Sequence, residues 1–393
     1  MGDVSEAVGD CEGSCGVMGM KRYLGDVCHF YTGTGFPTEL QGKTSGELPF
    51  YKVGDISINA AAGNTRLSMC NNYISRQEAN ELKGTILPAD TIVFAKIGEA
   101  LKLNRRAITN CDCLVDNNVM GIAPDAEVLR IGFFFYFMKR LKMQDLAEST
   151  TVPSVRKSKL ERVEITVPSI EEQIEIERKL QATDSIIQKR KQQLSALDNL
   201  IKARFVEMTE GADTVPTRMG DVATYINGYA FKPIDWAEKG LPIIRIQNLN
   251  DSSALFNYFS GNIDDKYRVF SGDVLVSWAT HLEAYIWTGG DAWLNQHIFR
   301  VVFDKMPINK VYFVYSTEEA LKQAFRNAHG FKPTMEHIKK NDFENAIVKL
   351  PSLYVQEEFA RFAEQIDKSK SVIQKSLDET QLLFDSLIQH YFG

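Results

Sequence analysis

The sequence predicts an α+β fold in which two α/β globular domains are separated by two long helices that form an antiparallel coiled coil. Three observations lead to this prediction. A long polar stretch carries apolar residues every seven positions, this stretch recurs at the C-terminal end, and the two segments before these stretches share a spaced set of residues. The chain order is therefore globular domain, long helix, globular domain, long helix, which is an internal repeat and not one large domain.

Residues 168–210 form the first expected long helix. Pro168 and Ser169 supply its start, because Pro is tolerated in the first turn and Ser is a favourable N-cap. At 1.5 Å per residue such a helix is roughly 60 Å long. Apolar residues recur at the interval of a coiled-coil seam, which we assign to Leu180, Ile187, Leu194, Leu197, Ile201 and Met208.

Residues 351–393 form the second expected long helix. Pro351 and Gln356 stand 183 positions after Pro168 and Gln173. Its seam is assigned to Ile366, Ile373, Leu377, Phe384, Leu387 and Tyr391. Polar residues such as Arg190 and Lys370 interrupt the two seams. Each helix therefore needs a partner, and the obvious partner is the other copy.

Residues 20–167 and 211–350 are the expected globular domains. Gly25-Asp26-Val27 matches Gly220-Asp221-Val222, and Gly33 matches Gly228 at the same offset of 195. Short runs rich in Val, Ile, Phe and Tyr predict strands, which we place at 50–56, 91–97, 105–109, 118–123, 243–248, 273–278, 284–288 and 297–303. Each domain has one amphipathic helix, at 127–147 and 309–328, and the aromatic cluster Phe133–Phe137 is expected in the core.

The composition is that of an ordinary soluble protein. The chain has 393 residues, which suggests two or three domains. Residues 1–19 are acidic and rich in Gly and are expected to form a disordered leader, with Met18 or Met20 as alternative starts. The longest apolar run, Phe133–Met138, is far too short to cross a membrane. The six cysteines all lie in the first third, so reduced thiols, a cytoplasmic location and no membrane association are expected.

No catalytic signature is present. The sequence lacks H-E-x-x-H, G-x-S-x-G and G-x-G-x-x-G after a strand. Gly42-Lys43-Thr44 resembles the end of a phosphate loop, but the loop requires Gly where Pro37 stands. There is no Asn-Pro-Pro-aromatic or Asp-Pro-Pro-aromatic run of adenine methyltransferases, and Cys111-x-Cys113 does not have zinc-finger spacing. We therefore expect no catalytic residue, no metal site and no cofactor in this chain.

Groups suited to DNA are abundant. The net charge of −6 argues mildly against nucleic acid, but residues 20–167 hold 19 basic and 16 acidic residues, and local clustering sets the surface field. Arg and Lys bond guanine, Asn and Gln bond adenine, and all four bond phosphate. The candidates in or beside expected loops are Lys43, Lys52, Arg66, Lys96, Lys102, Arg105, Arg106, Lys232, Arg245, Gln247, Asn248, Lys266, Arg268, His281, Asn295, Gln296, His297 and Lys332.

This organisation resembles the specificity subunit of type I restriction–modification systems. The resemblance is carried by Pro168-Ser169-Ile170-Glu171-Glu172-Gln173, followed by Leu180 and Asp184, and by the two Gly-Asp-Val starts. It covers nearly all of the chain after residue 20. The second helix departs from the pattern, with Tyr354-Val355 where the first has Glu171-Glu172, so its membership depends on spacing and on Gln356.

The resemblance implies that each globule is a target recognition domain that reads one half of a split, asymmetric double-stranded DNA sequence. The helices would act as a spacer, two methyltransferase subunits would dock and methylate adenines, and a motor and nuclease (restriction) subunit would join them. S-adenosylmethionine and ATP would belong to these partners. This chain would supply sequence choice and no catalysis.

Two other classes fit the sequence less well. The first is a protein–protein scaffold whose globules bind peptides or partner proteins on a coiled-coil spacer, which should show no retention of DNA. The second is a stand-alone modification or restriction enzyme, which the missing catalytic and cofactor motifs disfavour.

Overall fold

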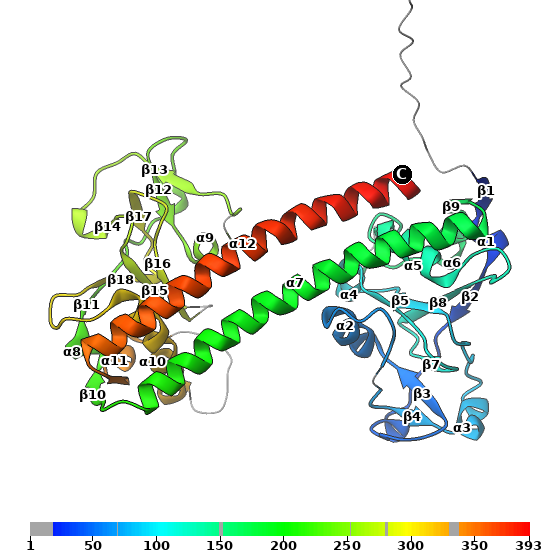
Figure 1. Cartoon of the computed structure of the whole chain (residues 1–393), viewed down its shortest axis with the longest axis horizontal. Helices are drawn as coiled ribbons and strands as arrows, with labels where there is room; N and C mark the ends of the chain where they lie inside the picture. The colour runs from blue at the N-terminus through cyan, green and yellow to red at the C-terminus, as the bar shows by residue number, and fades with distance from the viewer. Residues whose placement is uncertain (1–18, 69, 149–151, 252, 280–281, 330–337) are drawn as a thin grey trace, which may run out of the picture. The chain divides into compact units, whose positions relative to one another are not determined.

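The computed structural model of the protein (Figure 1) describes residues 19–68, 70–148, 152–251, 253–279, 282–329 and 338–393. The leader expected at 1–19 lies outside these residues apart from Gly19. The chain divides into two compact units. Unit 1 comprises the residues up to Lys191 together with Lys375–Gly393, and unit 2 comprises Gln192–Gln374.

The described part of unit 1 contains three small sheets. The first pairs β1 (Met20–Tyr23) with β9 (Glu164–Val167) in antiparallel register. The second has the order β2-β8-β5-β6, formed by Cys28–Thr32, Val119–Pro124, Ile92–Ala95 and Arg106–Ile108. The third has the order β4-β3-β7, formed by Tyr73–Ile74, Leu48–Tyr51 and Leu114–Val115. The helices are α1 (Leu24–Val27), η1 (Thr38–Leu40), α2 (Val53–Ala61), α3 (Arg76–Glu81), α4 (Glu99–Lys102), α5 (Ile131–Arg140) and α6 (Lys157–Leu160).

Unit 2 repeats this arrangement. β10 (Val215–Arg218) pairs with β19 (Ile347–Leu350). A second sheet has the order β11-β18-β15-β16, formed by Thr224–Asn227, Ile298–Val302, Val274–Ser277 and Glu283–Ile286. A third has the order β13-β12-β17-β14, formed by Asn257–Phe259, Leu241–Ile244, Ala292–Leu294 and Arg268–Val269. The helices are α8 (Met219–Val222), η2 (Pro233–Asp235), α9 (Ile246–Asn250), η3 (Asp265–Tyr267), α10 (Lys310–His329) and α11 (Lys340–Glu344).

The two long helices are α7 (Ile170–Glu210) and α12 (Leu353–Phe392), of 41 and 40 residues. In unit 2, Asp198 of α7 pairs with Lys370 of α12 at 2.6 Å, and Phe205 stacks edge-on against Phe359. Moving forward along α7 therefore means moving backward along α12, so the helices are antiparallel there.

Unit 1 shows the same helix pairing. Arg190 is one of the polar residues that interrupt the apolar seam in the sequence. Its side chain donates hydrogen bonds to the carbonyl oxygen of Ser376 and to the hydroxyl of Thr380. A polar layer of this kind favours one register of a coiled coil. The assigned seam residues are all shielded from solvent: Leu180, Ile187, Ile201, Leu377 and Phe384 are buried, and Leu194, Leu197, Met208, Ile366, Ile373, Leu387 and Tyr391 are half-buried.

The glutamine of the repeated helix start joins each long helix to its unit. Gln173 is fully buried; its amide donates to the carbonyls of Val128 and Pro168 and accepts from the amide of Arg130. Gln356 has the matching role in unit 2, where it donates to the carbonyl of Pro351 and accepts from the amide of Asn309. The motif is therefore explained by the need to satisfy buried backbone groups.

The strands expected at 50–56 and 243–248 are wrong in their second halves. β3 ends at Tyr51 and β12 at Ile244, and the helices α2 and α9 begin two residues later. The backbone amide of Lys52 donates to the Asp55 carboxylate at 2.7 Å, and that of Arg245 donates to the Asn248 side chain at 3.1 Å. These caps stabilise a helical turn despite the high strand propensity of the Val and Ile residues around them.

The helix expected at 127–147 is too long, since α5 ends at Arg140. The chain leaves the helix because two tertiary hydrogen bonds fix the next residues. Arg106 donates to the carbonyl of Leu141 at 2.9 Å, and the amide of Met143 donates to the side chain of Asn104 at 3.1 Å. The other expected strands overlap observed ones, and the helix expected at 309–328 is confirmed within one residue at each end.

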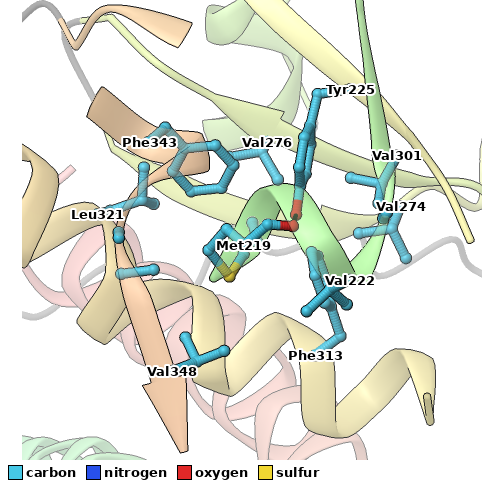
Figure 2. Packing of buried hydrophobic residues seen from close by; sticks show 14 of the residues in the cluster. Met219, Val222, Tyr225, Val274, Val276, Val301, Phe313, Leu321, Phe343 and Val348 are labelled. Carbon is cyan, nitrogen blue, oxygen red and sulfur yellow. Dashed lines mark hydrogen bonds between the residues drawn. The ribbon is translucent and has the colours of Figure 1, made fainter. Parts of the chain in front are cut away.

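Each unit has an apolar core. In unit 2, strands, short helices and α10 contribute Met219, Tyr225, Val276, Phe313 and Phe343, shown packed together in Figure 2. The hydroxyl of Tyr225 donates to the carbonyl of Met219, so this buried aromatic leaves no unsatisfied polar group. In unit 1 the aromatic cluster Phe133–Phe137 is buried, which confirms its assignment to the core.

Candidate nucleic-acid interface

The repeated glycines Gly33 and Gly228 lie where two loops touch. A Cβ atom on Gly33 would be 1.7 Å from the carbonyl oxygen of Asp116, and one on Gly228 would be 2.1 Å from that of Asn295. Only glycine permits this approach. In unit 1 the loop after β2 is therefore held against the loop before β8. In unit 2 the loop after β11 is held in the same way against the loop before β18.

Backbone pairing makes the two loop crossings equivalent. The next residues form parallel bridges, Thr34 with Asp116 in unit 1 and Tyr229 with Asn295 in unit 2. The amide of Asp116 donates to Tyr51 of β3, and that of Asn295 donates to Ile244 of β12. Asp116 and Asn295 thus occupy the same position in the two units, directly beside a helix start.

That helix start carries a basic residue in both units. Lys52 precedes α2 and Arg245 precedes α9, and a polar residue three positions later caps each helix. Lys52 and Arg245 consequently have fixed backbones, and their side chains lie beside the crossing loops.

In unit 2 this geometry gathers five of the sequence-predicted residues. A pocket of about 310 Å³ is lined by Phe231, Trp236, Ile243, Arg245, Ile246, Gln247, Asn295, Gln296 and His297. A neighbouring pocket of about 450 Å³ shares Gln296 and His297 and adds Asn227, Gly228, Tyr229, Ala230, Tyr267 and Trp278. We call Arg245, Gln247, Asn295, Gln296 and His297 the unit 2 recognition surface.

The side chains of the unit 2 recognition surface are set for hydrogen bonding. Arg245 donates to Asn257 at 3.2 Å, and its guanidinium lies 5.8 Å from the centre of the Trp236 ring, so its direction is restrained while other donors stay available. Within the described residues, the side-chain amides of Gln247 and Asn295 have no hydrogen-bond partner. Gln296 contacts the His297 ring at 3.2 Å. Arginine and amide groups presented together can bond base edges.

Sequence reasoning missed the aromatic residues around this surface. Tyr229 packs edge-on against Tyr267, and Trp278 lies with its ring centre 5.3 Å from that of His297. Aromatic residues in a sequence are most often assigned to the core. The available signal was the position of Tyr229 directly after the repeated Gly228.

The remaining candidates of unit 2 lie elsewhere. Asn248 is buried and bonds the carbonyls of Ala254 and Leu255, so its role is structural. Lys266 pairs with Asp264, whose carboxylate raises the lysine pKa, and Arg268 pairs with Asp291 at 2.7 Å. Lys266 is exposed and Arg268 is half-buried, and the two residues flank Tyr267 in the sequence. Lys232 is exposed, and His281 and Lys332 lie outside the described residues.

The candidates of unit 1 are more dispersed. Three of them form surface ion pairs, Lys43 with Glu78, Arg66 with Asp90 and Lys102 with Glu99. The Lys43 hydrogen bond lowers the pKa of Glu78 to about 2. Lys52 donates to Gln41 and lies 5.3 Å from the Phe36 ring centre, and Arg105 donates to the carbonyl of Ser57. Among the described residues the Lys96 ammonium has no partner.

Arg106 does not lie on the surface. It is 4 % exposed, and it holds Asn104 at 2.6 Å as well as the carbonyl of Leu141 after α5. Burial lowers its pKa to about 9, which still leaves the guanidinium charged at neutral pH. Arg106 therefore joins the segment at Asn104 to the segment after α5, and it is not among the proposed DNA contacts.

Neither a metal cluster nor a membrane span is found in the part of the chain that the structure describes. No three His, Cys, Asp or Glu side chains there are grouped as metal ligands. None of the described helices combines the length and apolarity that a membrane crossing needs. Cys28, Cys70, Cys111 and Cys113 are free thiols.

The fold defines a class of protein with two repeated α/β modules carried on paired long helices, each module presenting polar groups at the same loop crossing. The chain belongs to the family of the type I restriction modification DNA specificity domain, whose family model matches residues 19–196 and 212–380. The resemblance found in the sequence is thereby confirmed.

Two curated relatives are specificity subunits. The chain is 27% identical over 163 residues to the type I restriction enzyme EcoBI specificity subunit of Escherichia coli, a match that spans 40% of this chain and 34% of that one. It is 23% identical over 361 residues to the MjaIX specificity subunit of Methanocaldococcus jannaschii, spanning 80% of this chain and 81% of that one.

Solved structures share the fold. The type I restriction–modification S subunit from M. genitalium aligns over 99% of this chain and 98% of its own, with a TM-score of 0.54 and 12% identity. A chain from a structure of complex assembly and conformational transition of the type I system aligns over 94% of this chain and 96% of its own, with a TM-score of 0.50 and 16% identity.

Proposed function

We propose that this chain is a non-catalytic subunit that selects the DNA sequence modified by a type I restriction–modification complex. The observation that carries the proposal is the unit 2 recognition surface, which brings an arginine, three amides and a histidine to one loop crossing in a chain of this family. Arginine bonds guanine, and asparagine and glutamine bond adenine, in the major groove.

The two units are proposed to read different half-sites. At equivalent positions unit 1 has Lys52 and Asp116 where unit 2 has Arg245 and Asn295. The Asp116 carboxylate accepts hydrogen bonds from the backbone amides of Val53 and Asn118, whereas the side-chain amide of Asn295 has no hydrogen-bond partner among the described residues. A carboxylate favours the amino group of cytosine and a carboxamide favours adenine. This difference supports an asymmetric target.

Other basic residues are proposed to hold the phosphate backbone. Surface ion pairs contribute only about 0–1 kcal/mol, so a lysine or arginine in such a pair remains available to a phosphate. Such contacts position the protein and carry no sequence information. The proposed phosphate contacts are Lys43, Arg66, Lys96, Lys102, Arg105, Lys232, Lys266 and Arg268.

We also propose how the chain is divided. Residues 20–167 and 211–350 would be the target recognition domains, and 168–210 and 351–393 the spacer helices. The helices would fix the distance between half-sites and offer docking surfaces to two methyltransferase subunits, with a restriction subunit joining them. A rigid spacer makes half-site separation a property of the protein.

The proposal is tested by mapping methylated adenines in cells with and without the gene, in the presence of its methyltransferase partner. We expect a two-part motif with a fixed gap that disappears on deletion. An unchanged methylation map, together with no retention of DNA by the purified assembly, would favour the scaffold alternative.

The spacer role predicts a second result. Inserting one heptad into each long helix adds about 10 Å to each, or about three base pairs. The gap between the half-sites should lengthen while the half-site bases stay the same, as read from the methylation motif. A changed half-site with an unchanged gap would contradict the spacer role.

A further inference from the structure

Ile234 is a large apolar residue that is 89 % exposed on unit 2. A single exposed apolar side chain is common and needs no explanation by itself. Ile234 differs because it is held on an ordered turn and because that turn is joined to the unit 2 recognition surface.

The turn that carries Ile234 is closed by hydrogen bonds. It is the short helix η2, Pro233–Asp235, in which Pro233 restricts the backbone. The amide of Lys232 donates to the Asp235 carboxylate at 2.7 Å, and the amide of Asp235 donates back to the carbonyl of Lys232 at 2.9 Å. Ile234 is thus presented in a fixed place without being buried. A contact made from a preorganised turn costs little ordering entropy.

The same turn continues into the wall of the recognition surface. Two residues after Ile234, Trp236 lines the pocket that holds Arg245, with the guanidinium 5.8 Å from its ring centre. The amide of Ala237 then donates to the carbonyl of Tyr258 at 2.9 Å, which fastens the turn to β13. Figure 1 shows β13 grouped with β12, β14 and β17 in one part of unit 2.

The charges next to Ile234 balance, so the groups that suit DNA are those of the recognition surface that the turn joins. Lys232, Glu238 and Lys239 are exposed, and the carboxylate of Asp235 accepts a hydrogen bond from the Lys232 amide. Arg245, Gln247 and Asn295 carry the groups that bond base edges in the major groove. In that groove an apolar side chain contacts the C5-methyl group of thymine, which distinguishes thymine from cytosine.

We propose that Ile234 is a specificity-determining residue that reads the methyl group of a thymine in the half-site of unit 2, next to the base pair contacted by Arg245. This inference rests on the proposed function, because it requires unit 2 to bind duplex DNA through the recognition surface.

The test replaces each thymine of that half-site by uracil, which removes only the methyl group. Binding is measured with the purified complex of this chain and its methyltransferase partners. At one position, uracil should weaken binding by the unaltered complex about fourfold, the effect of burying one methyl-sized group. With Ile234→Ala, uracil at that position should have no effect. Ile347→Ala is the matched control: Ile347 is 48 % exposed on β19, and its variant should keep the uracil sensitivity.

Four results would overturn the inference. The first is that uracil weakens neither complex at any position, and the second is that it weakens both equally. The third is that Ile234→Ala changes the bending of the DNA, measured by fluorescence energy transfer, which would assign the residue to insertion between bases. The fourth is loss of methyltransferase co-purification, which would assign the residue to a protein contact. Failure of the proposed function is separate, because the unaltered complex would then not prefer the mapped half-site to a scrambled duplex.

Discussion

Replacing Arg245 by alanine is expected to relax the methylated sequence at one base pair, in only one of the two half-sites. Asn257 and Trp236 restrain its guanidinium, which favours a two-hydrogen-bond contact with guanine. Such a contact supplies about 1–3 kcal/mol of discrimination, or about fivefold to 150-fold in affinity. The measurement is the adenine methylation motif in cells that carry the variant.

Two further variants make this prediction specific. Arg245→Lys keeps the charge but loses the forked geometry, so it should relax the same base while retaining more binding than alanine. Lys52→Ala, the equivalent change in unit 1, should affect only the other half-site. An unchanged motif in Arg245→Ala, with normal thermal stability and normal methylation, would remove Arg245 from the recognition surface.

Replacing Gln173 by leucine is expected to cause the largest loss of stability. The change leaves the carbonyls of Val128 and Pro168 and the amide of Arg130 without their buried partner. Each lost partner costs about 1–3 kcal/mol, so the three together cost at least about 3 kcal/mol, which should lower the melting temperature of a unit of this size by at least roughly 6–12 °C. The measurement is differential scanning calorimetry of the full chain.

The second glutamine provides an internal comparison. Among the described residues, the Gln356 side chain bonds two backbone groups, the carbonyl of Pro351 and the amide of Asn309, so Gln356→Leu should cost less than Gln173→Leu. Gln192→Leu, at an exposed position of α7, should leave the melting temperature within about one degree, because surface substitutions change stability by less than about 0.5 kcal/mol. Equal melting temperatures for all three variants would contradict a stabilising role of the two buried glutamines.

Much of the fold could be predicted from the sequence. The seven-residue repeat identified α7 and α12, and the paired glycines identified the repeated modules. The helices α2 and α9 were missed, since their caps at Asp55 and Asn248 act against strand-forming neighbours. The C-terminal end of α5 was also missed, because it depends on a hydrogen bond from Arg106, which is distant in the sequence.

The candidate site was predicted in part. Arg245, Asn295 and Gln296 were selected because polar residues beside strands suit DNA, and the structure brings them together. The same reasoning selected Arg106 and Asn248, which are buried. It overlooked Ile234, because apolar residues in a sequence are usually assigned to the core.

The sequence by itself determined the periodic features: the long helices, the repeat, and the glutamines and glycines at matching positions. These features follow from local backbone geometry, which fixes how often a side chain returns to the same face. Only the tertiary structure decided which basic and amide side chains reach the surface and which satisfy buried carbonyls. That choice depends on the chain segment that covers each residue, and in this protein that segment is often more than 30 positions away, as for Arg106 and Leu141.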